Sequence, residues 1–305
     1  MGITLYKKPK LNNPVMIASW PGIGNVGLIV VEMLRNLLDA EEIGEIEPWD
    51  FFYPRKLFIK DDVIQDLEFP SSKFYVKRME KRDLLFFIGE EQPSWGGRTY
   101  AEGTKAYHLA NLVMDVALDF GCTRLYTSGA AVASVHHSNK PQVWAVPNSS
   151  HLLEEIKTYK NTVLMSNIEG RSGQGNITGL NGLLLGVARK RGLDAFCVMG
   201  EIPIYLQGFS ILYPKASLSV IELLNDVLGL NLDMSEIVEL AHRSEEEIDR
   251  LYEKLPAEAK GQLDKLKDVT HTKTIEAEQI TEEDKQKILE DIDTFFKRET
   301  GEDEN

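Results

Sequence analysis

The sequence contains few residues that could cross-link the chain, and no segment that could anchor it in a membrane. Only two of its 305 residues are cysteines, Cys122 and Cys197, and two cysteines cannot form a disulfide framework or a zinc knuckle. No run approaches the roughly 18 consecutive apolar residues that a membrane-spanning helix requires. The N-terminus lacks an apolar signal-peptide core, and Tyr6 stands where a myristoylation signal has Ser or Thr. We therefore expect a soluble, cytoplasmic protein.

Basic residues are also scarce. Lys and Arg number 34 against 48 Asp and Glu, which gives a net charge of −14. A chain with this charge and no cluster of Lys and Arg is not expected to bind nucleic acid, because phosphate contacts need such clusters. Residues 236–305 hold 22 acidic and 11 basic residues, whereas residues 1–235 hold 26 and 23. This asymmetry predicts a near-neutral core domain, 1–235, followed by an acidic helical extension, 236–305.

The core domain alternates between two patterns of apolar residues. Short apolar runs bounded by turn residues predict buried strands, and they lie at 14–19, 43–47, 83–89, 124–128, 142–146 and 194–200. Apolar residues at helical spacing predict helices, and these lie at 27–38, 99–120, 151–159, 179–191 and 213–228. This alternation is typical of an α/β sandwich with a mostly parallel sheet. Aromatic hairpins between residues 51 and 79 predict that some strands are antiparallel, so we expect a mixed sheet.

The C-terminal extension is helical and amphipathic. Helical spacing predicts helices at 234–255, 257–266 and 281–298. Their apolar stripes need a surface to pack on, either the core domain or a neighbouring subunit. For the last helix we favour a contact with a partner.

A glycine-rich turn follows the first buried strand. Residues Gly22, Gly24 and Gly27 match the spacing G-x-G-x-x-G at the start of a helix, and Glu47 ends the next predicted strand. This spacing resembles a dinucleotide-binding fingerprint, in which the glycines let the backbone approach a pyrophosphate. Alternatively, the glycines only form a tight strand-to-helix turn. The stiff pair Trp20-Pro21 before the turn, and the hairpins after Glu47, speak against the dinucleotide interpretation.

Several motifs resemble the proteasome assembly chaperone family, in its archaeal and bacterial branch. These are Trp20-Pro21-Gly22-Ile23-Gly24-Asn25-Val26-Gly27, Ser128-Gly129-Ala130, Gly175-Asn176-Ile177-Thr178-Gly179-Leu180-Asn181-Gly182-Leu183-Leu184, Tyr213-Pro214-Lys215-Ala216-Ser217 and Leu228-Gly229-Leu230-Asn231-Leu232-Asp233. The resemblance covers roughly Pro14 to Leu255. It implies a three-layer α/β/α fold similar to purine nucleoside phosphorylases, self-association, and, for characterised members, help in assembling proteasome α rings. It implies no known catalytic activity.

One part of the family pattern is missing at the end of the chain. Family chaperones that act on the proteasome can end in a hydrophobic residue, Tyr and any residue, a motif that docks between α subunits. This chain ends in Asp303-Glu304-Asn305. We therefore expect protein partners and self-association. Proteasome subunits are candidate partners, but the chain does not end in the motif that would dock it between α subunits.

Polar residues follow several of the predicted strands. Asn25 follows the first strand, Glu90 and Glu91 follow the strand at 83–89, and Glu201 follows the strand at 194–200. Ligands of open α/β sheets bind outside the carboxyl ends of the strands. Paired carboxylates at this edge would suit a nucleoside phosphorylase or hydrolase. In the alternative interpretation, each carboxylate caps a helix or faces water at a subunit contact.

A second glycine-rich loop precedes the helix at 179–191. It carries Arg171, Gly173, Gly175 and Asn176, and its backbone N–H groups could form a nest for an anion at the helix N-terminus. Together with the Gly22–Gly27 turn, it is our candidate ligand or anion loop.

Other residues give no comparable signal. His136 and His137 are adjacent, so their side chains diverge, and no carboxylate lies at a ligand spacing. We interpret them as loop or interface residues and predict no metal and no cofactor. Our leading hypothesis is an oligomeric, protein-binding, assembly-chaperone-like protein without a catalytic site. The alternatives are a nucleoside phosphorylase-like or hydrolase-like enzyme and, less favoured, dinucleotide binding at the Gly22–Gly27 turn.

Overall fold

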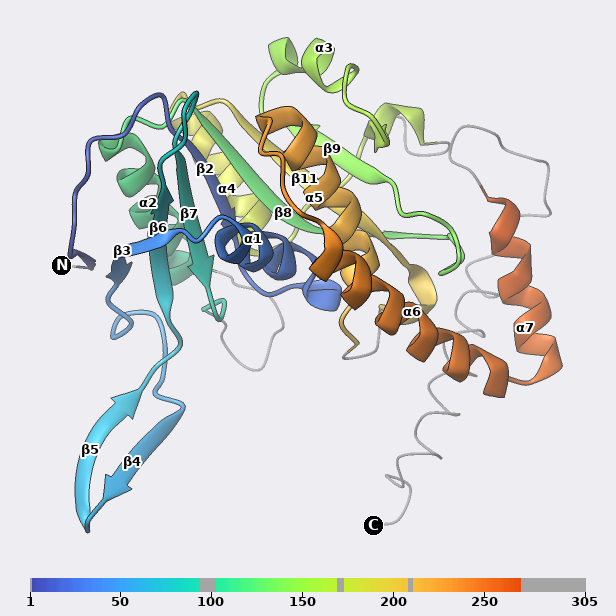
Figure 1. Cartoon of the computed structure of the whole chain (residues 1–305), viewed down its shortest axis with the longest axis horizontal. Helices are drawn as coiled ribbons and strands as arrows, with labels where there is room; N and C mark the ends of the chain where they lie inside the picture. Colours follow the sequence, from blue (N-terminus) through green and yellow to red (C-terminus); the bar gives the residue numbers. More distant parts are fainter. Residues whose placement is uncertain (1, 94–102, 169–172, 208–210, 270–305) are drawn as a thin grey trace.

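A mixed nine-stranded sheet forms the centre of the computed structural model, which describes residues 2–93, 103–168, 173–207 and 211–269 (Figure 1). Its strands, in spatial order, are β1(Ile3–Leu5), β3(Glu41–Ile46), β6(Ser72–Lys77), β7(Leu84–Gly89), β2(Val15–Ser19), β8(Arg124–Ala133), β11(Ala195–Pro203), β9(Val143–Pro147) and β10(Thr162–Val163). Strands β7, β2, β8 and β11 are mutually parallel, as are β9 and β10, and the other four neighbouring pairs are antiparallel. The predicted mixed sheet is confirmed, with parallel pairing prevailing at its centre.

Helices cover both faces of the sheet, which gives the predicted three-layer α/β/α sandwich. One face carries α1(Val26–Leu37) and α5(Pro214–Leu228), and the other carries α2(Gly103–Asp119) and α4(Gly179–Lys190). Successive side chains of a strand point to opposite faces. Accordingly Val15 and Ile17 of β2 pack with α1 and α5, whereas Met16 and Ala18 pack with α2 and α4. Burial on both faces explains why this strand is apolar at four consecutive positions.

Some elements differ from the sequence prediction. Strand β8 continues to Ala133, beyond the predicted end at residue 128. The predicted helix 151–159 is shorter and consists of a 3₁₀ turn, η2(Ser150–Leu152), and α3(Leu153–Ile156). The Thr158 hydroxyl donates a hydrogen bond to the carbonyl oxygen of Glu155. Such local side-chain bonding competes with continuation of a helix.

The C-terminal extension packs on the sandwich through α6(Ser235–Lys254), α7(Ala257–Asp264) and the 3₁₀ turn η5(Lys265–Asp268). Helix α6 runs past α5 and reaches beyond the sheet (Figure 1). Its residues Ile237 and Ile248 are buried, and so is Leu263 of α7. Ile248 and Leu263 share an apolar cluster with Ile202 of β11. The predicted helix at 281–298 lies outside the described residues.

A separate hairpin projects from the body (Figure 1). It consists of β4(Lys56–Lys60) and β5(Val63–Glu68), which pair in antiparallel fashion. Asp61 and Asp62 connect the strands with φ angles of 52° and 61°, as in the two-residue turns that suit the twist of a hairpin. The hairpin is the part of the described chain that lies farthest from the three-layer core in this view.

Candidate functional site

The Gly22–Gly27 turn is packed closely against its surroundings. It forms a 3₁₀ turn, η1(Ile23–Asn25), between β2 and α1. Gly24 has a φ angle of 60°, and Asn25, at the N-cap of α1, has one of 49°. A β-carbon at Gly27 would lie 2.3 Å from the backbone oxygen of Ser128. The backbone N–H of Tyr213 donates a hydrogen bond to the Gly24 oxygen. Gly27 therefore serves the close packing of α1 on β8, and no space for a pyrophosphate remains there.

The rest of a dinucleotide site is not assembled around this turn. Strands β6 and β7 separate β3, which precedes Glu47, from β2. The Glu47 carboxylate instead accepts a hydrogen bond from the Thr4 hydroxyl at 3.3 Å. In a dinucleotide-binding fold the acidic residue lies beside the glycine turn. The geometry therefore contradicts the dinucleotide alternative.

Glu90 and Glu91 hold the base of the β4–β5 hairpin. Their carboxylates accept hydrogen bonds from the Arg55 guanidinium at 3.0 and 2.6 Å. Glu90 also accepts one from the backbone N–H of Ser71. Burial alone would raise the pKa of Glu90, but the Ser71 and Arg55 donors outweigh it, so this pKa lies below its ordinary value. Both carboxylates thus have a structural role at the place where β7 ends and β6 begins.

Glu201 lies elsewhere and is 2 % exposed. Its carboxylate accepts hydrogen bonds from the backbone N–H of Gln142 at 2.9 Å and from the Trp144 indole at 2.7 Å. Strands β2 and β8 separate β11, which carries Glu201, from β7. The structure therefore does not bring Glu201 together with Glu90 and Glu91.

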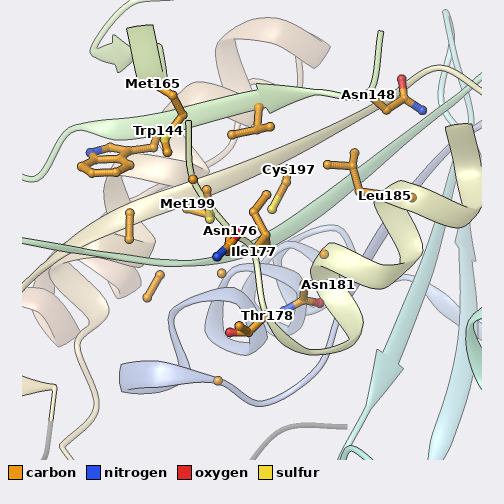
Figure 2. Close-up of a pocket in the computed structure, with 18 of the residues that line it drawn as sticks. Trp144, Asn148, Met165, Asn176, Ile177, Thr178, Asn181, Leu185, Cys197 and Met199 are labelled. Carbon is orange, nitrogen blue, oxygen red and sulfur yellow. The ribbon is translucent and has the colours of Figure 1, made fainter. Parts of the chain in front are cut away.

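A cavity of about 580 Å³ lies between α4 and the face of the sheet formed by β8, β11 and β9 (Figure 2). The two predicted ligand loops meet here, because Gly22 of the first loop and Gly173, Gly175 and Asn176 of the second all line it. Arg171 lies outside the described residues. Gly24, Asn25 and Gly27 are not among the lining residues. The size is within the usual range of small-molecule sites, so this is the candidate ligand site of the described chain.

The lining of the cavity suits binding better than catalysis. No Asp or Glu is among the described residues that line it. Cys197 lies on its floor, but burial raises the pKa of this thiol to about 11, which keeps it in the unreactive thiol form. The described residues contain no group of three or more His, Cys, Asp or Glu side chains placed to hold a metal ion.

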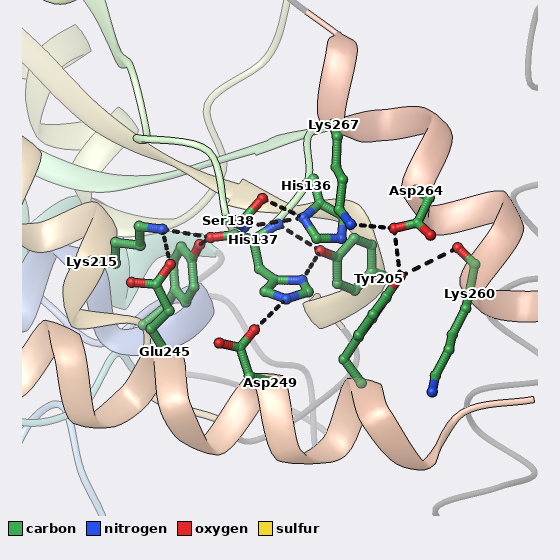
Figure 3. Close-up of polar contacts among 12 residues, drawn as sticks. His136, His137, Ser138, Tyr205, Lys215, Glu245, Asp249, Lys260, Asp264 and Lys267 are labelled. Atoms are coloured by element: carbon green, nitrogen blue, oxygen red, sulfur yellow. Dashed lines mark hydrogen bonds and ion pairs between the residues drawn. The ribbon is translucent and has the colours of Figure 1, made fainter.

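A second polar cluster joins the core to α6 and α7 (Figure 3). His136 and His137 follow β8 and are only 2 % and 1 % exposed. The His137 ring forms hydrogen bonds with the Tyr205 hydroxyl through Nδ1 at 2.6 Å and with Asp249 of α6 through Nε2 at 2.9 Å. Lys215 of α5 donates to the His137 carbonyl oxygen at 2.7 Å and pairs with Glu245 of α6. The sequence pattern of two adjacent histidines gave no sign of these partners.

The pKa values of the two histidines reflect this burial. Burial and, to a lesser extent, the neighbouring His137 lower the pKa of His136 to about 4. Burial also lowers the pKa of His137, although Asp249 opposes the shift. Both rings are therefore neutral at pH 7. Neutral, fully enclosed rings are suited to joining two parts of the chain, and we call this cluster the α6 junction.

The described helices include none that is both long enough and apolar enough to cross a bilayer.

The fold recurs in known proteins. The chain is 27 % identical to the uncharacterized protein MJ1210 of Methanocaldococcus jannaschii over 242 residues, which are 79 % of this chain and 84 % of that protein. Its structure is similar to Pyrococcus furiosus PbaB, described as an archaeal proteasome activator, with a TM-score of 0.65, 26 % identity, and coverage of 82 % of this chain and 97 % of PbaB. It is also similar to P. furiosus PbaA, described as an archaeal homolog of proteasome-assembly chaperone, with a TM-score of 0.59, 22 % identity, and coverage of 83 % and 97 %.

A family model confirms the resemblance that the sequence motifs predicted. The model of the PAC2 family matches residues 16–252, which is most of the sandwich and nearly all of α6. The chain therefore belongs to the PAC2 family.

Proposed function

We propose that the chain is an oligomeric, protein-binding, assembly-chaperone-like protein of the cytoplasm. Its family and its likeness to proteasome-assembly chaperone homologues support this proposal. Proteasome subunits are the first clients to test. We further propose that residues 1–235 form the core domain and that residues 236–305 are an acidic helical extension.

The single observation that carries the proposal is the exposed apolar face of the β4–β5 hairpin. Leu57 lies opposite Leu67, and Ile59 lies opposite Ile64. These four side chains are between 41 % and 68 % exposed. A two-stranded hairpin is only marginally stable by itself in water. Apolar side chains clustered on such a projecting element are typical of a protein-contact surface.

We propose a second copy of this chain as the partner of this apolar face. Lys56 and Lys60 lie at the two ends of β4, whereas Asp61 and Asp62 form the turn and Glu68 ends β5. Two copies packed face to face about a twofold axis parallel to the strands would place β4 of one copy over β5 of the other. The apolar face would be buried between the two copies, whereas Lys56, Lys60 and Glu68 alternate with its residues and point to the opposite, solvent-facing side.

Light scattering coupled to size exclusion tests this contact. The double variant Ile59→Lys/Ile64→Glu puts opposite charges at a cross-strand pair, so the hairpin itself can still form. We expect the wild-type oligomer to dissociate. Val238→Lys, at an exposed apolar residue of α6, is the matched control and is expected to remain oligomeric. A monomeric wild type, or a double variant with unchanged mass, would contradict the proposal.

A second experiment addresses the client. Recombinant proteasome α subunits are allowed to assemble with and without the protein, and ring formation is followed by native electrophoresis. Faster or more complete ring formation supports the assembly role. Unchanged assembly together with no co-elution of the two proteins would reject proteasome subunits as clients.

The proposed division at residue 235 is tested by deleting residues 236–305. The core domain is expected to keep its secondary structure in circular dichroism and to melt at a lower temperature, because the deletion uncovers the apolar cluster around Ile202. An unfolded product would show instead that the extension is an integral part of the core.

A further inference from the structure

The wall of the cavity along α4 has a distinct chemical pattern (Figure 2). Asn181, Gly182, Leu185, Gly186 and Arg189 all line the cavity. These positions recur at helical spacing, so they form one face of the helix. The face spans nine residues from Asn181 to Arg189, which rise by about 12 Å along an α-helix.

Close packing requires one of the two glycines of this wall but not the other. A β-carbon at Gly182 would lie 2.5 Å from the backbone oxygen of Ile177, so packing requires a glycine there. A β-carbon at Gly186 would meet no atom within 4 Å. A glycine inside a helix lowers its stability relative to alanine. Since packing does not require Gly186, its structural effect is to leave space on the wall of the cavity.

Asn181 has a free hydrogen-bond donor at the inner end of the wall. The side chain is 7 % exposed, and its Oδ1 accepts a hydrogen bond from the backbone N–H of Trp20 at 3.3 Å. Nδ2 donates to no residue that the structure describes, and it lies 3.9 Å from where a β-carbon would stand at Gly129 on the cavity floor. Because Asn181 lines the cavity, this amide can donate to an acceptor atom of a ligand there.

Arg189 has a free positive charge at the other end. It forms no ion pair with the residues that the structure describes, and the described lining contains no carboxylate. Between the two ends the lining includes Val146, Leu185 and Cys197, whereas Met199 and Trp144 lie level with Asn181, because Met199 pairs with both Gly129 and Trp144. The polar, apolar and cationic parts of the lining follow one another along the helix.

We propose that this cavity binds a small amphipathic carboxylate. The carboxylate pairs with the Arg189 guanidinium, the apolar body lies on Val146 and Leu185, and an acceptor oxygen at the far end receives the Asn181 Nδ2 donor. Ten-carbon chains are the probes of choice because α4 rises about 12 Å from Asn181 to Arg189. This site is independent of the hairpin and of the protein-binding role proposed above.

Isothermal titration calorimetry of the full chain with decanoate, 10-hydroxydecanoate and decanol tests the proposal. We expect saturable binding of decanoate, tighter binding of 10-hydroxydecanoate, and at least tenfold weaker binding of decanol. Arg189→Gln is expected to weaken decanoate binding at least fivefold and to leave decanol binding unchanged. Asn181→Asp keeps an oxygen for the Trp20 N–H but removes the donor, so it should abolish the advantage of the hydroxyl compound.

Gly186→Leu provides the most direct test, because it fills the open space on the wall. It is expected to weaken decanoate binding at least tenfold. Gly261→Leu on α7, where a β-carbon also meets nothing within 4 Å, is the matched control and should bind as wild type. The proposal is overturned if wild type shows no saturable binding, or if a folded Gly186→Leu variant, judged by its melting temperature, binds decanoate normally. Equal loss in both leucine variants would also reject it.

Discussion

The β4–β5 hairpin and the α6 junction are both additions to the three-layer core, but they differ in what they expose. The hairpin leaves Ile59 and Ile64 open to solvent, whereas α6 buries Ile248 against the end of β11. The two regions also differ in whether their polar groups are buried. The junction encloses His136 and His137, and the Arg55 contact at the hairpin base remains half exposed. Thus α6 has its partner within the same chain, and the hairpin is free to bind another.

The largest expected difference between the two regions concerns matched isoleucines. Ile248→Asp places a charge in an apolar cluster and should lower the free energy of unfolding by about 4 kcal/mol. Ile59→Asp in the hairpin should change it by less than about 0.5 kcal/mol in dilute protein. Urea unfolding of both variants measures the difference. Similar losses of unfolding free energy in the two variants would show that the hairpin side chain is also packed against other residues.

The α6 junction should also make stability depend on pH. The pKa of His136 is about 4 in the folded chain against an ordinary value of 6.5, so between these values the unfolded chain binds more protons. Stability is therefore full above pH 6.5 and falls as the pH drops toward 4, by up to about 3 kcal/mol. Asp249, Asp264 and Lys267 face this ring and contribute to its pKa.

Urea unfolding between pH 8 and pH 4.5 measures this dependence in wild type and in His136→Phe. The variant lacks the titrating group but keeps a buried ring, so its stability should vary less with pH. An identical pH dependence in both proteins would assign the effect to other groups.

A smaller effect is expected from a buried tyrosine of the junction. Tyr205→Phe removes the hydroxyl that accepts the His137 backbone N–H at 2.7 Å, and it should cost about 2 kcal/mol because a buried donor loses its partner. Tyr252→Phe removes an exposed bond to Asp264 and should cost less than about 0.5 kcal/mol. Thermal unfolding compares the two variants. Equal losses of stability would show that the buried hydrogen bond to His137 contributes no more than the exposed bond to Asp264.

The smallest effect concerns the base of the hairpin. Arg55→Gln removes two partly exposed ion pairs and should lower the free energy of unfolding by only about 0.5 kcal/mol. Amide hydrogen exchange should nevertheless become faster in β4 and β5 and stay unchanged in β2. Unchanged exchange in the hairpin would mean that Arg55 does not hold it.

Much of the core was predictable because its signals are local. The continuous apolar run of β7 and the alternation of strands and helices indicated a sheet covered on both faces, as observed. The weakest predictions concerned groups distant in sequence. Glu201 looked like a ligand group because of its position after a strand, but 57 residues away Trp144 supplies the donor that holds it. No local pattern carries this pairing.

The predicted ligand loops show the same division within a single motif. Gly22 reaches the cavity, whereas Gly27, five residues later, is required by the backbone of β8. Spacing alone could not separate these two uses, because both need a residue without a side chain. The α4 wall was predicted as a helix from its periodicity, but its role as one side of a cavity depends on the sheet beneath it.

The amino-acid order was sufficient for the family, the layered α/β class and helices α6 and α7, because each depends on residues close together in the chain. The assignment of individual side chains required the folded molecule. Packing of α6 against the end of β11 turned two adjacent histidines into a buried junction, and strand order kept Glu90 apart from Glu201. Burial and distance between remote segments decide which polar groups are free to bind, and these quantities arise only once the sheet has formed.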